Sequence, residues 1–268
     1  MSNRAPIIRP PAVAGTFYPS DPDVLRAEIR RAFDEAVPVT LPAVAPAGLI
    51  VPHAGYVYSG PIAASAYQRL EPAHHTIRRV VVLGPAHRVP LRGLGLSSAD
   101  AWETPLGLVP LDRAAAAIVE SLPGVEFNDR AHGPEHSLEV QLPFLQTVLD
   151  DFALVPLVVG DATPDEVVSV LDALWTGPDT LVVVSTDLSH YHRYDEAVEI
   201  DTRTVSHIAA REPAEIGDRD ACGARPLRGL LAAATARDAA VIPLDVRNSG
   251  DTAGGRERVV GYGAFGIG

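Results

Sequence analysis

Short, unbroken apolar runs alternate along the chain with longer segments in which apolar residues recur at helical spacing. Five runs rich in valine, leucine and isoleucine predict strands at residues 48–51, 79–83, 154–159, 180–184 and 240–244. Continuous apolar runs of this kind are typical of strands that are buried on both faces, as in a largely parallel sheet. We therefore expect a central sheet that is covered by helices on both sides.

The segments between these runs predict helices with recognisable ends. Asp21 and Pro22 supply a cap and a first-turn proline, and Thr163 and Glu166 form a capping box. Further helices are expected to open at Pro61, to run from Asp112 to about residue 123, to span residues 195–211, and to follow Cys222. The proline-rich residues 37–47 predict a loop.

Strands that alternate with helices favour an α/β fold, a three-layer α/β/α sandwich with a largely parallel or mixed central sheet. The chain contains no internal repeat and no low-complexity linker long enough to separate two domains. Residues 1–268 are therefore expected to form a single domain.

The composition removes several cofactor chemistries. All 22 basic residues are arginine, so the chain has no lysine for a Schiff base, a pyridoxal phosphate anchor or a P-loop. Its single cysteine, Cys222, excludes an intramolecular disulfide, a paired redox motif and a four-cysteine zinc site. Imidazole, carboxylate and one thiol remain as the main reactive groups.

The charge balance also narrows the range of partners. A formal net charge of −12 argues against nucleic acid and against anionic membrane surfaces, because binding to either rests on a basic face. No apolar run approaches the length of a membrane span, and the amino-terminal residues lack the hydrophobic region of a secretory signal. We expect a cytoplasmic protein in a reducing compartment.

Histidines follow three of the predicted strands directly. His53 follows the first strand and His87 the second, while His190 and Asp187 follow the fourth. In open parallel sheets, ligands bind beyond the carboxyl ends of the strands. Any one of these histidines alone fits an ordinary surface loop or a capped core position. Their equivalent positions together favour a shared site at one edge of the sheet.

Two imidazoles with one anionic ligand and open positions form the pattern of a catalytic transition-metal site. The third ligand could be either Asp187 or Cys222. Cys222 precedes a predicted helix, whose dipole lowers the pKa of a thiol and favours the thiolate. A lone cysteine fits a small buried apolar residue equally well, and sequence spacing does not bring Cys222 to the histidines.

A further polar cluster lies at the start of a helix, in residues 132–139. His136 is expected to orient a ligand or to close the pocket, whereas Glu135 and Ser137 also fit ordinary helix caps. The other histidines stand in unremarkable contexts: solvated side chains are expected for His74, His75 and His207, and His192 receives no assignment.

Six segments of the chain match a set of ordered motifs. They lie at residues 14–19, 51–60 (VPHAGYVYSG), 83–87 (LGPAH), 135–139 (EHSLE), 185–191 (STDLSHY) and 221–223. Together they resemble the Memo family, also called AmmeMemoRadiSam system protein B, and they cover most of the chain. The resemblance implies a fold similar to that of the class III, or LigB-like, extradiol dioxygenases. Those enzymes hold non-haem Fe(II) with two histidines and a glutamate.

Carried over by motif, the resemblance implies that His53 and His87 are the imidazole ligands and that Cys222 replaces the glutamate. Asp187 and His190 match the polar pair of the family's pocket, with His190 in the place of the dioxygenase acid/base. Three more residues of the matching motifs are expected to line the pocket or to support its ligands: His136, Glu135 and Tyr56.

The cysteine changes the expected chemistry. A thiolate is softer and more easily oxidised than a carboxylate, which weakens the case for ring cleavage. The resemblance implies an iron or copper ion, with zinc as an alternative, and a redox role. It also implies partners of the radical SAM and AMME-region types, besides an unidentified small molecule or peptide.

Two other hypotheses compete with a metal-dependent oxidoreductase. The first is a non-catalytic metal-binding or scaffold protein with a vestigial dioxygenase site, which binds a peptide or a partner enzyme. The second is a metal-independent thiol enzyme, with Cys222 as the nucleophile and His190 as the base. The thiol enzyme ranks last because it gives His53 and His87 no role.

Overall fold

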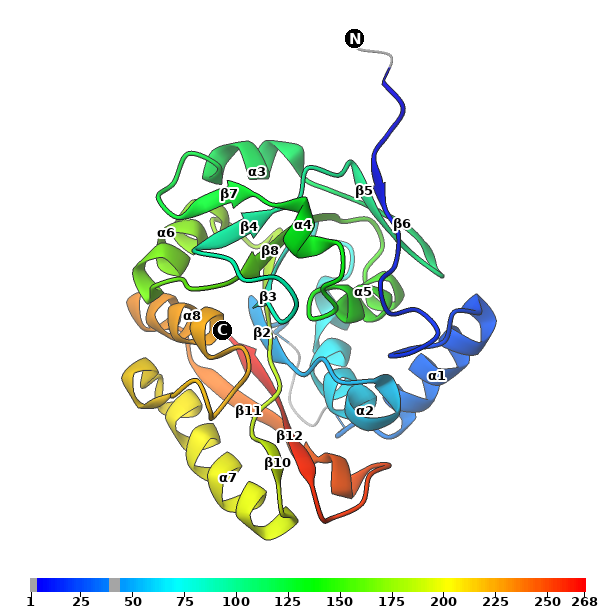
Figure 1. The fold of residues 1–268 in the computed structure, drawn as a ribbon, viewed down its shortest axis with the longest axis vertical. Coiled ribbons are helices and arrows are strands. Elements are labelled where there is room, and N and C mark those ends of the chain that lie inside the picture. The colour runs from blue at the N-terminus through cyan, green and yellow to red at the C-terminus, as the bar shows by residue number, and fades with distance from the viewer. Residues whose placement is uncertain (1–3, 39–43) are drawn as a thin grey trace.

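A computed structural model describes residues 4–38 and 44–268 of the chain (Figure 1). A nine-stranded sheet runs through its centre, and β11 (Val241–Asn248) pairs with β12 at one end. The other strands lie in the order β10 (His190–His192), β12 (Val259–Ile267), β2 (Gly48–Val51), β9 (Thr180–Ser185), β3 (Arg79–Pro85), β8 (Ala153–Val159), β4 (Leu94–Leu96) and β7 (Val125–Phe127).

The middle of this sheet is parallel. The strands β2, β9, β3 and β8 all run in the same direction, and Leu83 of β3 lies between Val184 and Leu157 of its neighbours. Antiparallel pairs flank them, since β12 pairs antiparallel with β2, β10 and β11, and β4 pairs antiparallel with β8. The sheet is therefore mixed, with a parallel core made of four of the five predicted strands.

Alternate residues of each core strand point to opposite faces of the sheet, as the strand period of two requires. In β3, Val80 and Val82 belong to one hydrophobic core, and Val81 and Leu83 belong to the other. The first core includes α1 (Pro22–Asp34), α2 (Tyr56–Tyr67) and α5 (Leu142–Val148); the second includes α3 (Arg113–Val119), α6 (Pro164–Leu174), α7 (Tyr194–Ala210) and α8 (Ala224–Ala236). Figure 1 shows the two helical layers. The predicted α/β/α sandwich is confirmed; the single domain stays a prediction.

A smaller sheet completes the first face. It joins β1 (Ile8–Arg9), β5 (Ala101–Thr104) and β6 (Gly107–Pro110) in the order β1–β5–β6. Trp102 of β5 is buried in the core of this face. The short helix α4 (Asp129–His132) follows β7. None of these elements is predicted by the sequence, because their apolar runs are too short to show a period.

Two expectations differ from the structure, and a third is described only in part. The helix expected to open at Pro61 begins at Tyr56 and holds Pro61 inside it, because α2 is buried almost all round and shows no amphipathic start. The run at 240–244 belongs to β11, an antiparallel strand with Ile242 half exposed, and is not buried on both faces. Within the expected loop at 37–47, residues 39–43 lie outside the described residues, and the rest contains no helix or strand.

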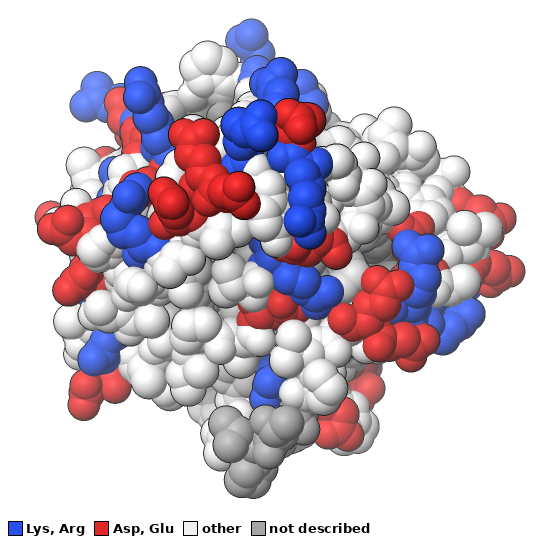
Figure 2. Space-filling view, turned by 90° about the horizontal axis from the view of Figure 1, so that it is seen from below, with Lys and Arg blue, Asp and Glu red and all other residues white. Residues whose placement is uncertain are grey.

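Charges of both signs lie side by side on the surface. On the face drawn in Figure 2, arginine and acidic side chains are interspersed, and a broad uncharged area separates them in places. Among residues 4–38 and 44–268, we find no helix with the length and apolar character that a membrane crossing requires. The cytoplasmic location stays a prediction.

We expect Gly229→Ala in α8 to destabilise the fold by about 1–3 kcal/mol, measured by chemical denaturation. A Cβ atom at Gly229 would lie 2.4 Å from the Val167 side chain of α6, so the two helices must move apart. Gly60 of α2 provides a matched control, because its Cβ would lie 3.5 Å from Ala32, an ordinary contact. Gly60→Ala is expected to be neutral or stabilising, by up to about 1 kcal/mol. Equal effects of the two changes would contradict the packing argument.

Candidate metal centre

The parallel core of the sheet sets the position of three polar side chains. His53 lies two residues after the end of β2, His87 two residues after the end of β3, and Asp187 two residues after the end of β9. Because these strands are adjacent and parallel, their carboxyl ends meet at one edge of the sheet. The three residues therefore face the same space.

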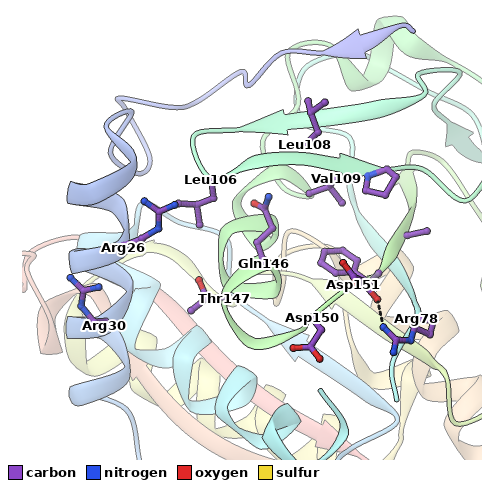
Figure 3. Close-up of a pocket in the computed structure, with 13 residues that line it drawn as sticks. Arg26, Arg30, Arg78, Leu106, Leu108, Val109, Gln146, Thr147, Asp150 and Asp151 are labelled. Atoms are coloured by element: carbon purple, nitrogen blue, oxygen red, sulfur yellow. Dashed lines mark hydrogen bonds between the residues drawn. The ribbon is translucent and has the colours of Figure 1, made fainter. Parts of the chain in front are cut away.

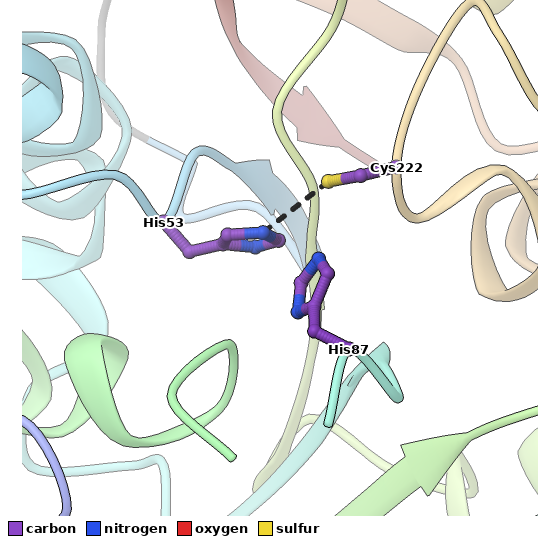
Figure 4. A group of neighbouring side chains, drawn as sticks. All are labelled: His53, His87 and Cys222. Atoms are coloured by element: carbon purple, nitrogen blue, oxygen red, sulfur yellow. Dashed lines mark hydrogen bonds between the residues drawn. The ribbon is translucent and has the colours of Figure 1, made fainter. Parts of the chain in front are cut away.

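Cys222 reaches this space from the loop before α8. Its backbone N–H donates to the carbonyl of Asp187 at 3.2 Å, and its Sγ lies 3.2 Å from Nε2 of His53. Figure 4 shows His53, His87 and Cys222 converging from three separate segments. One nitrogen from each imidazole and the sulfur all lie within 4.8 Å of one another. Folding thus supplies the proximity that sequence spacing does not.

Hydrogen bonds fix which nitrogen of His53 carries the proton. The hydroxyl of Ser185 donates to the carbonyl of Ser137 at 2.6 Å and accepts from Nε2 of Gln141 at 2.8 Å. Its proton is therefore committed, so Nδ1 of His53, at 2.9 Å, is the donor. Burial, with smaller effects from neighbouring histidines, lowers the pKa of His53 well below its ordinary value. The ring is neutral, and the lone pair on Nε2 faces Cys222.

Glu135 anchors His87 through Nδ1, as Ser185 anchors His53. Its buried carboxylate accepts from Nδ1 of His87 at 3.0 Å and from the backbone N–H of His87 at 2.6 Å. Burial raises the pKa of Glu135, but hydrogen bonds from His136, His87 and the Ser137 backbone outweigh it and hold the pKa well below its usual range. A carboxylate behind an imidazole that leaves Nε2 free is the usual support of a histidine metal ligand.

The thiol of Cys222 is not acidic. Burial, and next the negative charge of Asp187, raise its pKa to about 12. The expectation that the helix dipole favours a thiolate is therefore wrong, because burial outweighs the dipole. The nucleophilic thiol enzyme loses its main support. A bound cation reverses this balance, since a coordinating thiol is deprotonated outright. Two imidazoles that each direct Nε2 to this space, together with a thiol that a cation would deprotonate, fit a transition-metal ion.

Asp187 and His190 stand beside these three groups. Oδ1 of Asp187 accepts the backbone N–H of His53 at 2.7 Å, and burial raises the pKa of this carboxyl. Nδ1 of His190 donates to the carbonyl of Leu188 at 2.8 Å, which leaves Nε2 as an acceptor. Donor atoms of Asp187, His190 and Cys222 also lie within 4.8 Å of one another. The structure thus brings all five expected ligand and catalytic residues together.

These groups form the floor of a cavity of about 980 Å³. His136 lines it and packs against His87 with 4.8 Å between ring centroids. Tyr56 does not line it: its hydroxyl donates to the carbonyl of Val140 at 2.6 Å from a buried position behind the site. Sequence reasoning missed several other residues of the wall, among them Phe17, Tyr58, Tyr262 and Arg258. Phe17 and Tyr58 stand inside matching motifs, which could have identified them.

The remaining histidines lie in different surroundings. His132 is buried and its Nε2 contacts the carbonyl of Gly95 at 2.9 Å, away from the residues that line the cavity. His192, which had no assignment, lines the cavity and contacts Glu196. His75 is exposed and pairs with Asp150, as a solvated histidine does.

A second cavity, of about 690 Å³, lies at the opposite edge of the sheet, where β3 and β8 begin (Figure 3). Arg26 and Arg30 of α1 line one side of it, and Arg78 and Asp151 line another. Its lining residues include no histidine and no cysteine, although Asp150, which lines it, belongs to a group of three possible metal donors with His74 and His75.

Tyr191 is held in a strained backbone conformation at the mouth of the larger cavity. Its φ is 64°, in the left-handed region, and its side chain is largely exposed. We expect Tyr191→Gly to leave the stability unchanged or to raise it by up to about 1 kcal/mol, because glycine adopts this φ without strain. Tyr58→Gly, in the helical backbone of α2, should instead cost about 1 kcal/mol or more. Thermal unfolding of both variants tests the difference; a clear loss for Tyr191→Gly would contradict it.

Comparisons with known proteins agree with these motifs. A family described as Memo-like protein matches residues 9–265. A MEMO1 family protein of Methanothermobacter thermautotrophicus is 39% identical, with 96% of this chain and 99% of that protein covered. A MEMO1 family protein of Methanopyrus kandleri is 38% identical, with 96% and 98% covered.

Among solved structures, an uncharacterized protein of Escherichia coli K12 has a similar fold. The TM-score is 0.57 and the sequence identity is 18%, over 82% of this chain and 99% of that one. This likeness supports the fold alone. The match over nearly the whole length and the curated relatives together carry the assignment: the chain belongs to the Memo family.

Proposed function

We propose that this protein holds a transition-metal ion with His53, His87 and Cys222 and acts as a non-haem iron or copper redox protein related to the extradiol dioxygenases. One observation carries the proposal. Both imidazoles are anchored through Nδ1, by Ser185 and Glu135, so that each offers an Nε2 lone pair to the space that Cys222 faces. Any buried imidazole bonds a partner through its N–H, but here the second nitrogen of each ring is also directed to a shared space with a sulfur atom, which is the arrangement of a histidine metal ligand.

The donor set supports the choice of metal. Imidazole suits iron, copper and zinc, while a thiolate favours the softer copper ion or a covalent iron site over magnesium or calcium. When bound, the ion supplies Lewis acidity and one-electron redox chemistry. Zinc would supply the first of these without the second.

The chain's own residues supply the proton chemistry. His190 holds or accepts a proton at Nε2, because Nδ1 is already committed to Leu188. Asp187 keeps the His53 loop in place through the backbone N–H of His53. The walls around them leave room for a small organic molecule or a short peptide segment. Partners of the radical SAM and AMME-region types remain part of the proposal, and co-purification with the tagged protein tests them.

Elemental analysis tests the metal. The protein is purified without oxygen from cells supplied with iron, copper and zinc, and we expect close to one iron or copper ion per chain. His53→Ala should lose that ion, whereas His207→Ala, which removes a histidine that belongs to none of the donor groups found among the described residues, should retain it. A folded wild type that contains no metal, even after anaerobic reconstitution, would exclude the proposed function.

A second candidate is a non-catalytic metal-binding or scaffold protein that uses the same site. The thiol in the place of a carboxylate favours it, because a sulfur ligand is oxidisable near oxygen. Oxygen uptake by the metal-loaded protein on a panel of dihydroxy-aromatic compounds separates the two candidates. Any ring-cleavage product counts against the scaffold, and metal binding without turnover on that panel counts in its favour.

A further inference from the structure

Arg9, at the end of β1, is a buried arginine. Its side chain is 6% exposed and lies over the ring of Trp102, 4.2 Å from the centroid. Nε and Nη2 donate to the carbonyl of His132 at 3.0 and 2.9 Å, and Nη2 also donates to the carbonyl of Glu135 at 2.7 Å. One guanidinium thus holds both ends of residues 132–135.

Glu139 is the carboxylate that balances this charge. It is fully buried and accepts from Nη1 of Arg9 at 2.6 Å. It also accepts from the backbone N–H groups of Ala12 and Val13, at 2.7 and 3.0 Å, and from the hydroxyl of Tyr18 at 2.6 Å. A single side chain therefore binds residues 9–18, which we call the amino-terminal clamp, to the loop of residues 132–139.

This loop carries the support of a proposed metal ligand. The carbonyl of Glu135 is held by Arg9, and its carboxylate holds both the Nδ1 and the backbone N–H of His87. The far end of the clamp contacts the site as well. Phe17 packs on His136, with 4.6 Å between ring centroids, and its carbonyl accepts the N–H of Tyr56, three residues after His53.

We propose that Arg9 is a positioning residue for His87 and that docking of the amino-terminal clamp is coupled to metal binding. The inference rests on the proposed function, since it concerns the same metal site. Without Arg9 nothing described holds the carbonyls of both His132 and Glu135, so residues 132–135 lose their anchor. The Glu135 carboxylate is then held toward His87 only by the N–H groups at the other end of its side chain, those of His87, His136 and Ser137. Coupling is reciprocal, so a bound ion must in turn stabilise the docked clamp.

Titration with Co(II) alone, in a chain freed of other metals, tests whether Arg9 positions His87 for metal binding. We expect Arg9→Met combined with Glu139→Gln, which leaves no unpaired buried charge, to bind Co(II) about 10-fold more weakly, the lower range for loss of a ligand's support. Arg9→Lys should restore the charge beside Glu139 but not the forked contact with two carbonyls, so the thermal midpoint should recover more than the affinity does. Arg79→Met is the matched control, because it breaks the Arg79–Asp112 ion pair outside the residues that line the site.

Amide hydrogen exchange tests whether docking of the amino-terminal clamp is coupled to metal binding. Exchange of residues 132–139 should rise in metal-free Arg9→Met/Glu139→Gln, and Co(II) should slow exchange of residues 9–18 in the wild type. Wild-type affinity in a folded double variant, or no effect of Co(II) on the clamp, would overturn the coupling alone. A wild type that binds no Co(II) would overturn the metal site itself and the coupling with it, so the two failures are distinguishable.

Discussion

Cys222→Ser is expected to weaken Cu(I) binding by more than about 100-fold, since loss of a ligand's support alone costs up to that much and here the ligand itself changes. Serine keeps the size of the side chain and can still accept the backbone N–H of Asp187, which lies 3.3 Å from Sγ. The fold should therefore persist. Because a hydroxyl is a harder ligand than a thiolate, the preference for copper over zinc should also fall.

Competition with a chromophoric Cu(I) chelator measures this affinity, and the thiolate charge-transfer band of the Co(II)-loaded protein provides a second readout. The band should be absent in Cys222→Ser. His192→Gln is the control, because His192 lines the same cavity but belongs to none of the donor groups found among the described residues. An unchanged Cu(I) affinity in Cys222→Ser would show that the ion is held elsewhere.

Acid is expected to destabilise the metal-free protein strongly, through His132. Burial lowers the pKa of His132 from 6.5 to about 4 in the folded chain. Well above pH 6.5 the His132 ring is neutral in both the folded and the unfolded chain. Between pH 6.5 and pH 4 the unfolded chain binds a proton at His132 and the folded chain does not. The contribution of His132 to the free energy of unfolding should therefore fall by up to about 3 kcal/mol between pH 6.5 and pH 4 and then level off. His53, whose pKa burial also lowers, acts in the same direction.

Denaturant unfolding at several pH values, with a chelator present, tests this expectation. His132→Gln retains a donor for the carbonyl of Gly95 but cannot titrate, so its loss of stability in acid should be smaller by the His132 contribution, and the part caused by His53 should remain. His75→Gln removes an exposed histidine and should keep the wild-type pH dependence. If His132→Gln loses as much stability in acid as the wild type, another group is responsible.

The sequence predicts the parallel core of the fold and the histidines that follow it. Runs such as Val80–Leu83 carry a clear signal because both faces of the strand are buried, and the ends of such strands mark His53 and His87. The glycine-rich β12 shows no such run, so the strand that joins β2 to β10 and β11 is missed. This strand is held by its pairing with β2, β10 and β11, and such pairing leaves no periodic pattern in the sequence.

The candidate site is predicted less completely. Residues that follow strands of one sheet share an edge by geometry alone, whereas Cys222 enters from a loop and is placed only by the motif resemblance. Its acidity was misjudged because the dipole of α8 is a local effect, and burial depends on the whole fold. Arg9 carries no signal at all: a lone arginine near the amino terminus predicts an exposed side chain.

His53 and Cys222 are separated by 169 residues along the chain, and this separation affects when the proposed metal site can form. In small zinc-binding domains the ligands are close in sequence, and the ion can drive folding from an early stage. Here the three donors come together only in a chain that has been synthesised at least as far as Cys222 and has folded so that the loop before α8 lies beside the ends of β2 and β3. For the proposed site, a nascent chain that has not reached Cys222 offers an ion only two of the three donors, so we expect metal to bind tightly only after folding.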